Sequence, residues 1–375
     1  MNPAGATRRA LLALAIPGCA AAQPPLVTPP AAPGGGLHAR AAAKGLAFGA
    51  ALATRHLAEA DLMAAFRADC GLLVAEYEMK WAELEPQAGN RRWRRADQLV
   101  DFARRNRMAL RGHTLVWHES EPRWVSDLSA RGAEAALARH VDETMQRWRG
   151  AIGTWDVVNE AVAPEHGRPD WLRRTWLLNR LGPDHIAQAF HIAHAADPAA
   201  RLAYNDFGVE HATAWSRRRR IGILTLLRAL RASGVPVHVL GVQAHLHAGQ
   251  PFEASEWRAF LADVAALGLT IEITELDVND RALPAAAAPR DAGVADLVRR
   301  FLDVTLAEPA VRAVVSWGLT DRHSWIREGR LAEHRRRDRA TPRPLPYDEA
   351  MRRKPMWAAI AAALDAAPHR GPRRG

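Results

Sequence analysis

The chain is poor in cysteine and has no long apolar segment. It contains only two cysteines, Cys19 and Cys70, among 375 residues, which excludes a small scaffold held together by several disulfides. No run approaches the roughly 20 consecutive apolar residues that a membrane-spanning helix needs. We therefore expect a globular chain without a transmembrane segment, and its hydrophobic content of 48% is enough for a large core.

Three motifs that mark common enzyme classes are also missing. A Gly-x-Gly-x-x-Gly fingerprint would indicate a dinucleotide-binding fold, and a Gly-x-Ser-x-Gly elbow would indicate a serine nucleophile. A His-Glu-x-x-His helix would indicate a catalytic zinc, and neither His113 nor the pair His245 and His247 has a third ligand at a diagnostic spacing. We expect no cofactor and no metal ion.

Tyrosine is scarce and lysine contributes little to the charge, whereas arginine and tryptophan are abundant. The net charge is +10, and 13 Trp stand against 3 Tyr. A basic balance can indicate nucleic-acid binding. Here the arginines are scattered through alanine-rich stretches, and the cluster Arg217 to Arg220 is typical of a solvated helix face, so we expect no nucleic-acid partner. Tryptophan suits both core packing and stacking on sugar rings.

The first 22 residues differ in composition from the rest of the chain. They contain Arg8-Arg9, a short apolar run and then small residues, which predicts a signal peptide with a twin-arginine start as one option. Lipid attachment at Cys19 is an alternative. We expect an exported protein, periplasmic or secreted. With Cys19 removed or lipidated, Cys70 is left as an inert thiol in the core.

Short apolar runs alternate with helix-like stretches through the middle of the chain. Eight runs predict strands: Gly45–Gly49, Leu72–Ala75, Ala109–Thr114, Thr154–Val158, Arg201–Asn205, Val239–Ala244, Thr270–Thr274 and Ala313–Trp317. Strands that alternate with helices form parallel sheets of the α/β class, and eight such units fit a closed (β/α)8 TIM barrel. We predict one such domain over residues 41–367, between a flexible linker (23–40) and a disordered tail (368–375). An open doubly wound sheet is the alternative.

Polar side chains cluster at one end of these strands. The active site of a barrel lies at the carboxyl ends of its strands, where the sequence places Glu160 in Trp-Asp-Val-Val-Asn-Glu and Glu275 in Ile-Thr-Glu-Leu-Asp. Hydrolysis of a glycosidic bond needs two carboxyl groups, one to protonate the leaving oxygen and one to attack or stabilise the sugar carbon. A lone Glu or His in such a place is more often solvated or structural, so the prediction depends on the whole set.

The alternation of side chains along a strand separates the roles of the two glutamates. Glu275 and Asp277 face the same side of one strand, and His245 at the end of the preceding strand can bridge them. A histidine held by Asp277 would keep Glu275 ionised, which makes Glu275 the better nucleophile. The negative charge of Glu275 would raise the pKa of Glu160, as a general acid requires.

Four segments together resemble glycoside hydrolase family 10, the retaining endo-β-1,4-xylanases. They are Gly112-His113-Thr114-Leu115-Val116-Trp117-His118, Trp155-Asp156-Val157-Val158-Asn159-Glu160, Gly241-Val242-Gln243-Ala244-His245 and Ile273-Thr274-Glu275-Leu276-Asp277. Three shorter segments extend the likeness: Glu78-Met79-Lys80-Trp81, Tyr204-Asn205-Asp206, and Trp317-Gly318-Leu319-Thr320-Asp321 with Ser324-Trp325. The resemblance covers roughly residues 45 to 365, and the joint order and spacing of the segments is far more specific than any one of them.

The resemblance implies a role for each candidate residue. Glu160 would be the acid/base and Glu275 the nucleophile, with His245 and Asp277 in support. The sugar just before the scissile bond would be surrounded by Lys80, His113, Trp117, Asn159, Gln243 and Trp325, and the next sugar outward would be held by Glu76 and Trp317.

The activity that the resemblance implies is retaining hydrolysis of internal β-1,4 bonds in xylan and xylo-oligosaccharides, and we expect the enzyme to act as a monomer. Two alternatives stay open. One is an enzyme of the same chemistry that acts on another β-glycan, and the other is a carbohydrate-binding protein that has lost catalysis.

Four residues depart from the family pattern. Tyr77 and Gly208 each replace an Asn, Ser120 replaces a Gln, and Val162 replaces a frequent Phe. Tyr77 and Ser120 would fall in the outer glycone subsite, away from the chemistry. We therefore predict weaker or altered binding of the second glycone sugar.

Overall fold

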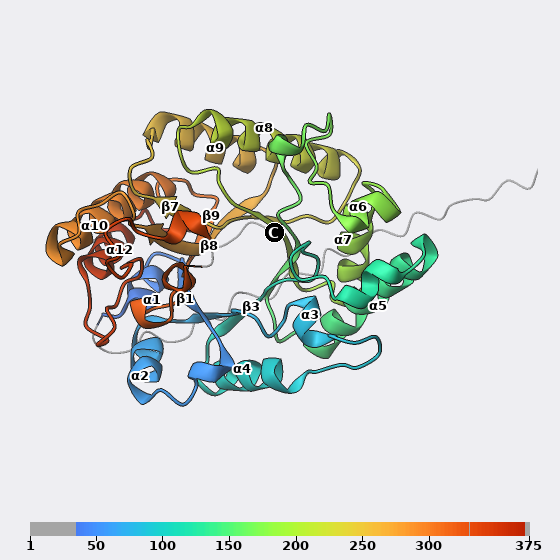
Figure 1. Cartoon of the computed structure of the whole chain (residues 1–375), viewed down its shortest axis with the longest axis horizontal. Coiled ribbons are helices and arrows are strands. Elements are labelled where there is room, and N and C mark those ends of the chain that lie inside the picture. Colours follow the sequence, from blue (N-terminus) through green and yellow to red (C-terminus); the bar gives the residue numbers. More distant parts are fainter. Residues whose placement is uncertain (1–34, 330, 372–375) are drawn as a thin grey trace, which may run out of the picture.

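The strands form one parallel sheet that closes on itself, and helices surround it (Figure 1). The computed structural model describes residues 35–329 and 331–371. Around the ring the strands pair in the order β6-β5-β4-β3-β2-β1-β9-β8, and β6 also pairs with β8. A short strand, β7, follows β6 and pairs with the later part of β8. The predicted (β/α)8 barrel is confirmed.

All eight predicted strands exist, although some differ in length. The strands are β1 (Ala47–Leu52), β2 (Leu72–Ala75), β3 (Ala109–Gly112), β4 (Thr154–Asn159), β5 (Arg201–Asp206), β6 (Val239–Val242), β7 (His245–His247), β8 (Thr270–Asn279) and β9 (Val311–Ser316). β8 continues past its predicted end, so Glu275 and Asp277 lie inside a strand. β6 ends at Val242, before the predicted end at Ala244, and Ala244 itself takes a left-handed backbone conformation (φ 59°) outside the β region.

The main helices run around the outside of the barrel (Figure 1). They are α1 (Leu37–Ala42), α2 (Ala60–Asp69), α3 (Trp81–Leu84), α4 (Arg94–Arg105), α5 (Ala130–Arg147), α6 (Trp176–Leu181), α7 (His185–Ala196), α8 (Ala214–Ala232), α9 (Ala254–Ala266), α10 (Ala287–Thr305), α11 (Trp325–Glu328) and α12 (Pro355–Ala366). Short 3-10 helices are η1 (Thr54–His56), η2 (Arg123–Asp127), η3 (Pro164–His166), η4 (Asp321–His323) and η5 (Ala332–His334). Side-chain caps start two long helices: Ser129 accepts from Gly132 N before α5, and Thr213 accepts from Ser216 N before α8.

A cluster of buried charged side chains joins three strands inside the barrel. The guanidinium of Arg111 on β3 contacts the carboxylates of Asp156 on β4 and Glu272 on β8, and all three are buried. Burial opposes the charge of Arg111, but the two carboxylates outweigh it and raise its pKa. Asp156 also lies 3.1 Å from Nδ1 of His113, so the cluster connects the core with a predicted sugar-binding residue.

The amino-terminal end of the barrel is structured earlier than the composition predicts. α1 begins at Leu37, within the segment 23–40, so the linker prediction is wrong for its last residues. Leu37 is buried, and its N–H donates to Asp69 at 3.1 Å. Alanine suits a helix as well as a linker, because it has the highest helix propensity. The predicted signal peptide and Cys19 lie outside the described residues.

At the other end, part of the segment predicted as a disordered tail is bound to the barrel. The guanidinium of Arg370 donates to the carbonyl oxygens of Leu306 at 2.6 Å and Val311 at 3.2 Å. Its backbone N–H donates to Lys44 at 2.8 Å. The domain therefore extends to Arg370, three residues beyond its predicted end at 367.

The arginine cluster 217–220 is only partly solvated, so that prediction is wrong for two of its members. Arg217 and Arg218 are exposed, whereas Arg219 and Arg220 are buried. Arg219 donates to the carbonyl of Phe207 and to the carboxylate of Asp206, and Arg220 donates to the carbonyls of Val209 and His211. The helical period turns these two side chains inward, where they hold the loop that follows β5.

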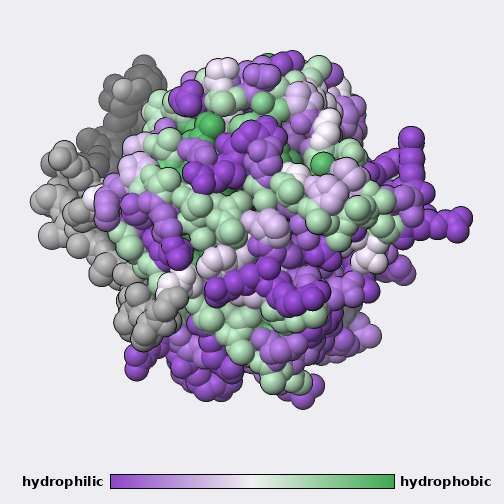
Figure 2. Space-filling view, turned by 90° about the vertical axis from the view of Figure 1, so that its left-hand side faces the viewer, coloured by the Kyte–Doolittle hydropathy of each residue, from purple (hydrophilic) through white to green (hydrophobic). Residues whose placement is uncertain are grey.

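The surface mixes side chains of different character. Figure 2 shows one face, on which hydrophilic and weakly hydrophobic residues are interspersed. Among the described residues, the large apolar side chains that are exposed are Trp215, Ile221 and Leu331. Within residues 35–329 and 331–371, no helix has both the length and the apolar character needed to cross a bilayer. Cys70 is buried, and burial raises the pKa of its thiol, as expected for an inert core cysteine.

Candidate active site

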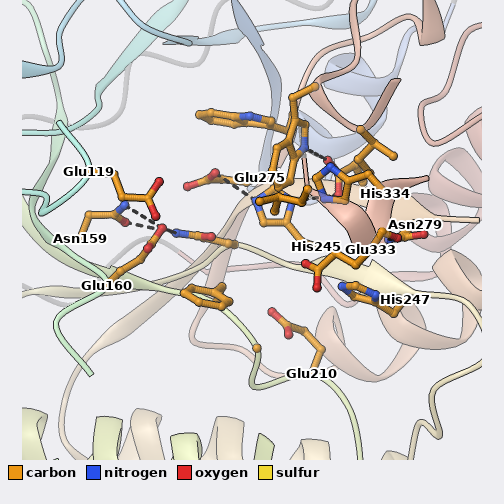
Figure 3. Close-up of a pocket in the computed structure, with 18 of the residues that line it drawn as sticks. Glu119, Asn159, Glu160, Glu210, His245, His247, Glu275, Asn279, Glu333 and His334 are labelled. Atoms are coloured by element: carbon orange, nitrogen blue, oxygen red, sulfur yellow. Dashed lines mark hydrogen bonds and ion pairs between the residues drawn. The ribbon is translucent and has the colours of Figure 1, made fainter. Parts of the chain in front are cut away.

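A cavity of about 590 Å³ opens at the carboxyl ends of the strands. All the candidate residues predicted from the sequence line it, and they come from most of the barrel strands or from the loops that follow them. They are Glu76, Lys80, His113, Trp117, Asn159, Glu160, Gln243, His245, Glu275, Asp277, Trp317 and Trp325. Figure 3 shows Asn159 and Glu160 together on one side of this cavity, with Glu275 beside His245 on the other.

Glu275 is surrounded by groups that stabilise its negative charge. His245 Nε2 lies 3.3 Å from one carboxylate oxygen, and Asn205 donates to the other at 2.9 Å. His245 Nδ1 lies 2.8 Å from Asp277, which also accepts a 2.6 Å hydrogen bond from the Trp325 indole. Burial by itself raises the pKa of Glu275, but the hydrogen bond from His245 and the nearby cations outweigh it and lower the pKa to about 2.

The same contacts keep His245 protonated. Burial lowers the pKa of His245, whereas the charges and hydrogen bonds of Asp277 and Glu275 raise it, and the result is a pKa well above the ordinary value. The sequence predicted that His245 bridges Asp277 and Glu275. The structure places the three side chains in that order, because β7 pairs with β8 so that His245 lies opposite Asp277.

Glu160 sits in a different environment. It follows β4 with a left-handed backbone (φ 59°), and its N–H donates to the carbonyl of Asn205 at 2.8 Å. Its carboxyl group accepts from Gln243 at 3.0 Å and from Asn159 at 3.2 Å, both of which are neutral amides. Burial raises the pKa of Glu160 to about 7.

The direction of this shift agrees with the prediction, but its cause differs. The sequence suggested that the charge of Glu275 raises the pKa of Glu160. In the structure burial is the largest cause, and the charge of Asp206 contributes more than that of Glu275. The two carboxyl groups are connected through neutral amides: Asn205 donates to Glu275 and to Asn159, and Asn159 donates to Glu160.

A further wall of the cavity is formed by aromatic rings that surround the Lys80 ammonium group. Lys80 Nζ lies 4.8 Å from the Trp117 ring, 5.0 Å from the Tyr77 ring and 5.9 Å from the Trp317 ring. Burial lowers the pKa of Lys80 even though four glutamates act to raise it. The His113 ring packs edge-on against Trp317 at 5.3 Å. Such a wall offers flat apolar faces together with hydrogen-bond donors, which is what a sugar ring needs.

Sequence reasoning missed several residues that shape the site. Asn205 belongs to the segment Tyr204-Asn205-Asp206, but the sequence alone assigns it no role. Its amide donates to Asn159 and to Glu275, both at 2.9 Å, and its oxygen accepts from Thr274 at 2.7 Å. Arg173 donates to the carbonyl of Glu160 at 2.7 Å from a loop that carried no signal. The position of Asn205 at the end of a strand was the signal that could have identified it.

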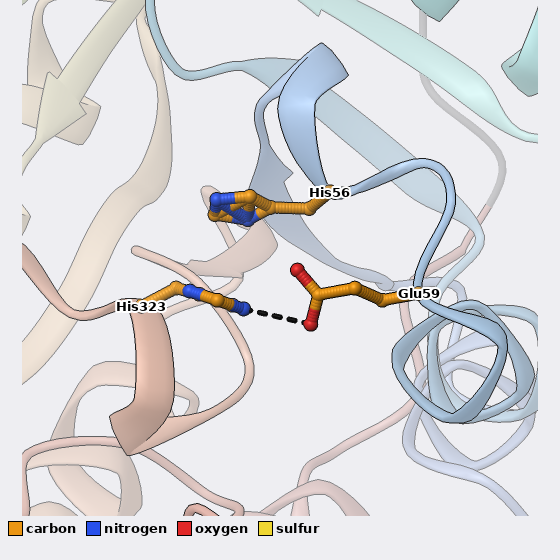
Figure 4. A group of neighbouring side chains, drawn as sticks. All are labelled: His56, Glu59 and His323. Carbon is orange, nitrogen blue, oxygen red and sulfur yellow. Dashed lines mark hydrogen bonds and ion pairs between the residues drawn. The ribbon is translucent and has the colours of Figure 1, made fainter.

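A second group of ionisable side chains lies outside this cavity. Among the described residues, His56, Glu59 and His323 bring potential metal-ligand atoms within 4.8 Å of one another (Figure 4). Protein cations already contact this group: Arg55 donates to His56 at 2.8 Å, and Arg322 donates to Glu59 at 2.9 Å. Two guanidinium groups at this distance oppose the binding of a dication.

Comparison with known proteins identifies the family to which the chain belongs. The match to Glycosyl hydrolase family 10 extends over residues 36–363. The chain belongs to glycosyl hydrolase family 10. Among family 10 relatives, an endo-1,4-beta-xylanase of Geobacillus stearothermophilus is 35% identical over 274 residues, which are 68% of this chain and 78% of that protein. Endo-1,4-beta-xylanase A of Caldicellulosiruptor sp. (strain Rt8B.4) is 33% identical over 68% of this chain.

The chain spans 39% of the length of this Caldicellulosiruptor relative. One solved family 10 structure matches this chain over nearly the whole length of that structure. Xylanase 10B from Thermotoga petrophila RKU-1, in complex with xylobiose, has a TM-score of 0.78 and 29% identity, and the match covers 88% of this chain and 97% of that one. The resemblance to family 10 that the sequence segments indicated is thereby confirmed.

Proposed function

We propose that this family 10 chain is a retaining endo-1,4-β-xylanase in which Glu160 is the general acid/base and Glu275 is the nucleophile. The observation that carries the proposal is the opposite pKa shift of two carboxyl groups in one cavity. With pKa values of about 7 and about 2, Glu160 is protonated and Glu275 is ionised between these limits. An acid and a nucleophile are the two groups that a retaining glycosidase needs.

In the first step, Glu275 attacks the anomeric carbon while the bond from that carbon to the leaving oxygen breaks. Glu160 gives its proton to this oxygen, and the glycosyl group is left as an ester of Glu275. In the second step, water attacks the same carbon, Glu160 takes a proton from the water, and the ester bond to Glu275 breaks. Two inversions at one carbon give net retention. The expected separation of the two carboxyl groups is about 5–5.5 Å.

The remaining predicted residues would bind and orient the sugar. The amide of Asn159, next to Glu160 in the chain, would hydrogen-bond a sugar 2-OH as charge develops in the transition state. Lys80, Trp117 and Trp317 would enclose the glycone sugars, in keeping with their mutual contacts. The names of the relatives support xylan as the substrate.

A stereochemical assay tests this function. The wild-type chain should release reducing ends from xylan, with the β-anomer formed first as seen by proton NMR. Glu275→Ala should abolish turnover on xylan and on an aryl β-xylobioside. Formation of the α-anomer first would overturn the retaining mechanism. Faster turnover of cellulose or mixed-linkage glucan than of xylan would move the substrate to another β-glycan, and absence of turnover with bound xylo-oligosaccharide would indicate a binding protein.

We further infer that the protein is exported. The inference rests on the basic, apolar and small-residue segments of residues 1–22. Cell fractionation and N-terminal sequencing of the mature protein test it, and a protein that keeps its first 22 residues in the cytoplasm would contradict it. Labelling with a radioactive fatty acid distinguishes lipid attachment at Cys19 from simple cleavage.

A further inference from the structure

One large aromatic side chain lines the cavity but has no part in the proposed mechanism. Trp215 lies in the first turn of α8, lines the cavity, and is 41% exposed. An exposed indole leaves apolar surface in water, which disfavours the free protein. At the edge of a binding cavity, such a surface is typical of a ligand contact.

The position of Trp215 around the barrel tells which part of a substrate it can reach. Glu160 follows β4, and a general acid stands beside the leaving group whose oxygen it protonates. β5 is the direct neighbour of β4, with Asn205 opposite Asn159. The loop after β5 leads into α8 and Trp215. Glu76 follows β2 and Trp317 follows β9, and these two strands flank β1 on the opposite side of the ring. Trp215 is therefore on the leaving-group side, away from Glu76 and Trp317.

The indole is held in place by the loop beneath it. A Cβ atom added to Gly208 would lie 2.2 Å from Cζ3 and 2.3 Å from Cη2 of Trp215, so the ring occupies space that any other residue at 208 would fill. The Arg219 guanidinium lies 4.9 Å from the Trp215 ring and 4.1 Å from the Phe207 ring. Arg219 is buried and anchored to Asp206, so this support is fixed before a ligand arrives.

We propose that Trp215 is a sugar-binding platform for the leaving-group part of the xylan chain, at a ring distal to the scissile bond, and that Gly208 admits the indole to this position. The proposal rests on the proposed function, because it needs Glu160 as the acid. A β-linked xylose ring carries its hydroxyl groups around its equator, so each face is a C–H surface that can stack on an indole. A preformed platform loses little conformational freedom on binding.

The test compares substrates that differ only in what lies on the leaving side. Xylohexaose carries sugar rings there, whereas an aryl β-xylobioside has none beyond the aryl group. In the full chain, Trp215→Ala should lower kcat/KM for xylohexaose about three- to tenfold. For this variant, the kcat/KM for xylohexaose divided by the kcat/KM for the aryl β-xylobioside should fall by the same factor. Trp215→Phe should recover most of this ratio, because a smaller aromatic face remains.

Two further variants make the test specific. Ile221→Ala removes the other large exposed apolar side chain of α8, which does not line the cavity, and should leave the ratio as in the wild type. Gly208→Ala should lower the ratio as Trp215→Ala does, since the new Cβ displaces the indole. On xylohexaose, both active-site variants should shift cleavage toward products with fewer sugars on the leaving side.

The outcomes separate this proposal from the proposed function. If the wild type does not hydrolyse xylan, the proposed function fails. If it does, and Trp215→Ala leaves the ratio and the product pattern unchanged, only the platform is refuted. Equal losses on both substrates would also refute the platform, because they would mean that Trp215 supports the fold of the site and does not contact a distal sugar.

Discussion

Replacing His245 by alanine isolates what keeps Glu275 ionised. Burial raises the pKa of Glu275, and the hydrogen bond from His245 is the largest effect that lowers it, followed by the charges of His113, His245 and Lys80. The pKa falls from the ordinary 4.5 to about 2. At 1.36 kcal/mol per unit, this corresponds to roughly 3 kcal/mol in favour of the charged carboxylate.

Without His245, burial becomes the dominant influence on Glu275. We expect its pKa in His245→Ala to return to about 4.5 or above. Glu275 must be ionised to attack, so activity is lost as the pH falls through this pKa, and the acid limb of the profile should move up by about two units or more. Glu160 must be protonated, so activity is lost as the pH rises through about 7. That limb should stay in place, because burial sets it.

The assay is kcat/KM on an aryl β-xylobioside between pH 3 and pH 8.5, with circular dichroism at each pH to show that the protein stays folded. The alkaline limb is the internal control. Asp277→Asn provides a graded variant, because it leaves His245 in place but removes the charge that holds its proton, and it should move the acid limb by less. The wild-type acid limb, near pH 2, lies below this range. A His245→Ala profile that stays flat down to pH 3, or an alkaline limb that moves together with the acid limb, would therefore refute the reasoning.

The other predictions concern the acid, the core and the outer glycone subsite. Glu160→Gln should remove the alkaline limb and lower kcat on xylan by a factor of ~10²–10⁴. The decrease in kcat should be far smaller on a dinitrophenyl xylobioside, whose leaving group needs no proton. Equal decreases on both substrates would contradict the acid role. Arg111→Met should destabilise the fold by about 3–5 kcal/mol in urea unfolding, because it removes the guanidinium group that pairs with buried Asp156 and the nearer of the two guanidinium groups that contact buried Glu272. Arg299→Met, which breaks an exposed pair with Asp303, should change stability by less than about 0.5 kcal/mol. Tyr77→Asn with Ser120→Gln should lower KM for xylo-oligosaccharides, and an unchanged KM and cleavage pattern would disprove the outer-subsite prediction.

The barrel could be predicted because its strands are buried on both faces. Apolar runs such as Leu72–Ala75 then stand out against the helices between them. The end of β8 could not be predicted in the same way. Glu275 and Asp277 are polar and look like loop residues, yet His245, Asn205 and Trp325 satisfy their carboxylates inside the strand. Only the tertiary contacts show that a strand continues through them.

The candidate site was predictable in its membership but only partly in its energetics. Sequence spacing places Glu160 and Glu275 at one end of the barrel, and the parity of β8 correctly places Glu275 and Asp277 on one face. The depth of Glu160 in the cavity is a property of the folded walls, so burial as the main cause of its raised pKa was not accessible from the sequence. Arg219 and Arg220 show the same limit: they continue the run begun by the exposed Arg217 and Arg218, and only their rotational position on α8 turns them inward.

The roles proposed for the two glutamates follow from where the cations lie. His245 and Lys80 are both on the side of Glu275, and Lys80 interacts more strongly with Glu275 and Glu76 than with Glu160. Asn159 and Gln243 contact the carboxyl of Glu160 through their side-chain amides, which are neutral. Neutral donors can fix the position of a carboxyl group without holding it ionised, since a cation in their place would lower its pKa and remove the proton that the leaving oxygen needs. In the proposed mechanism, the asymmetry of charge around two buried carboxyl groups, and not their distance alone, makes one of them the acid and the other the nucleophile.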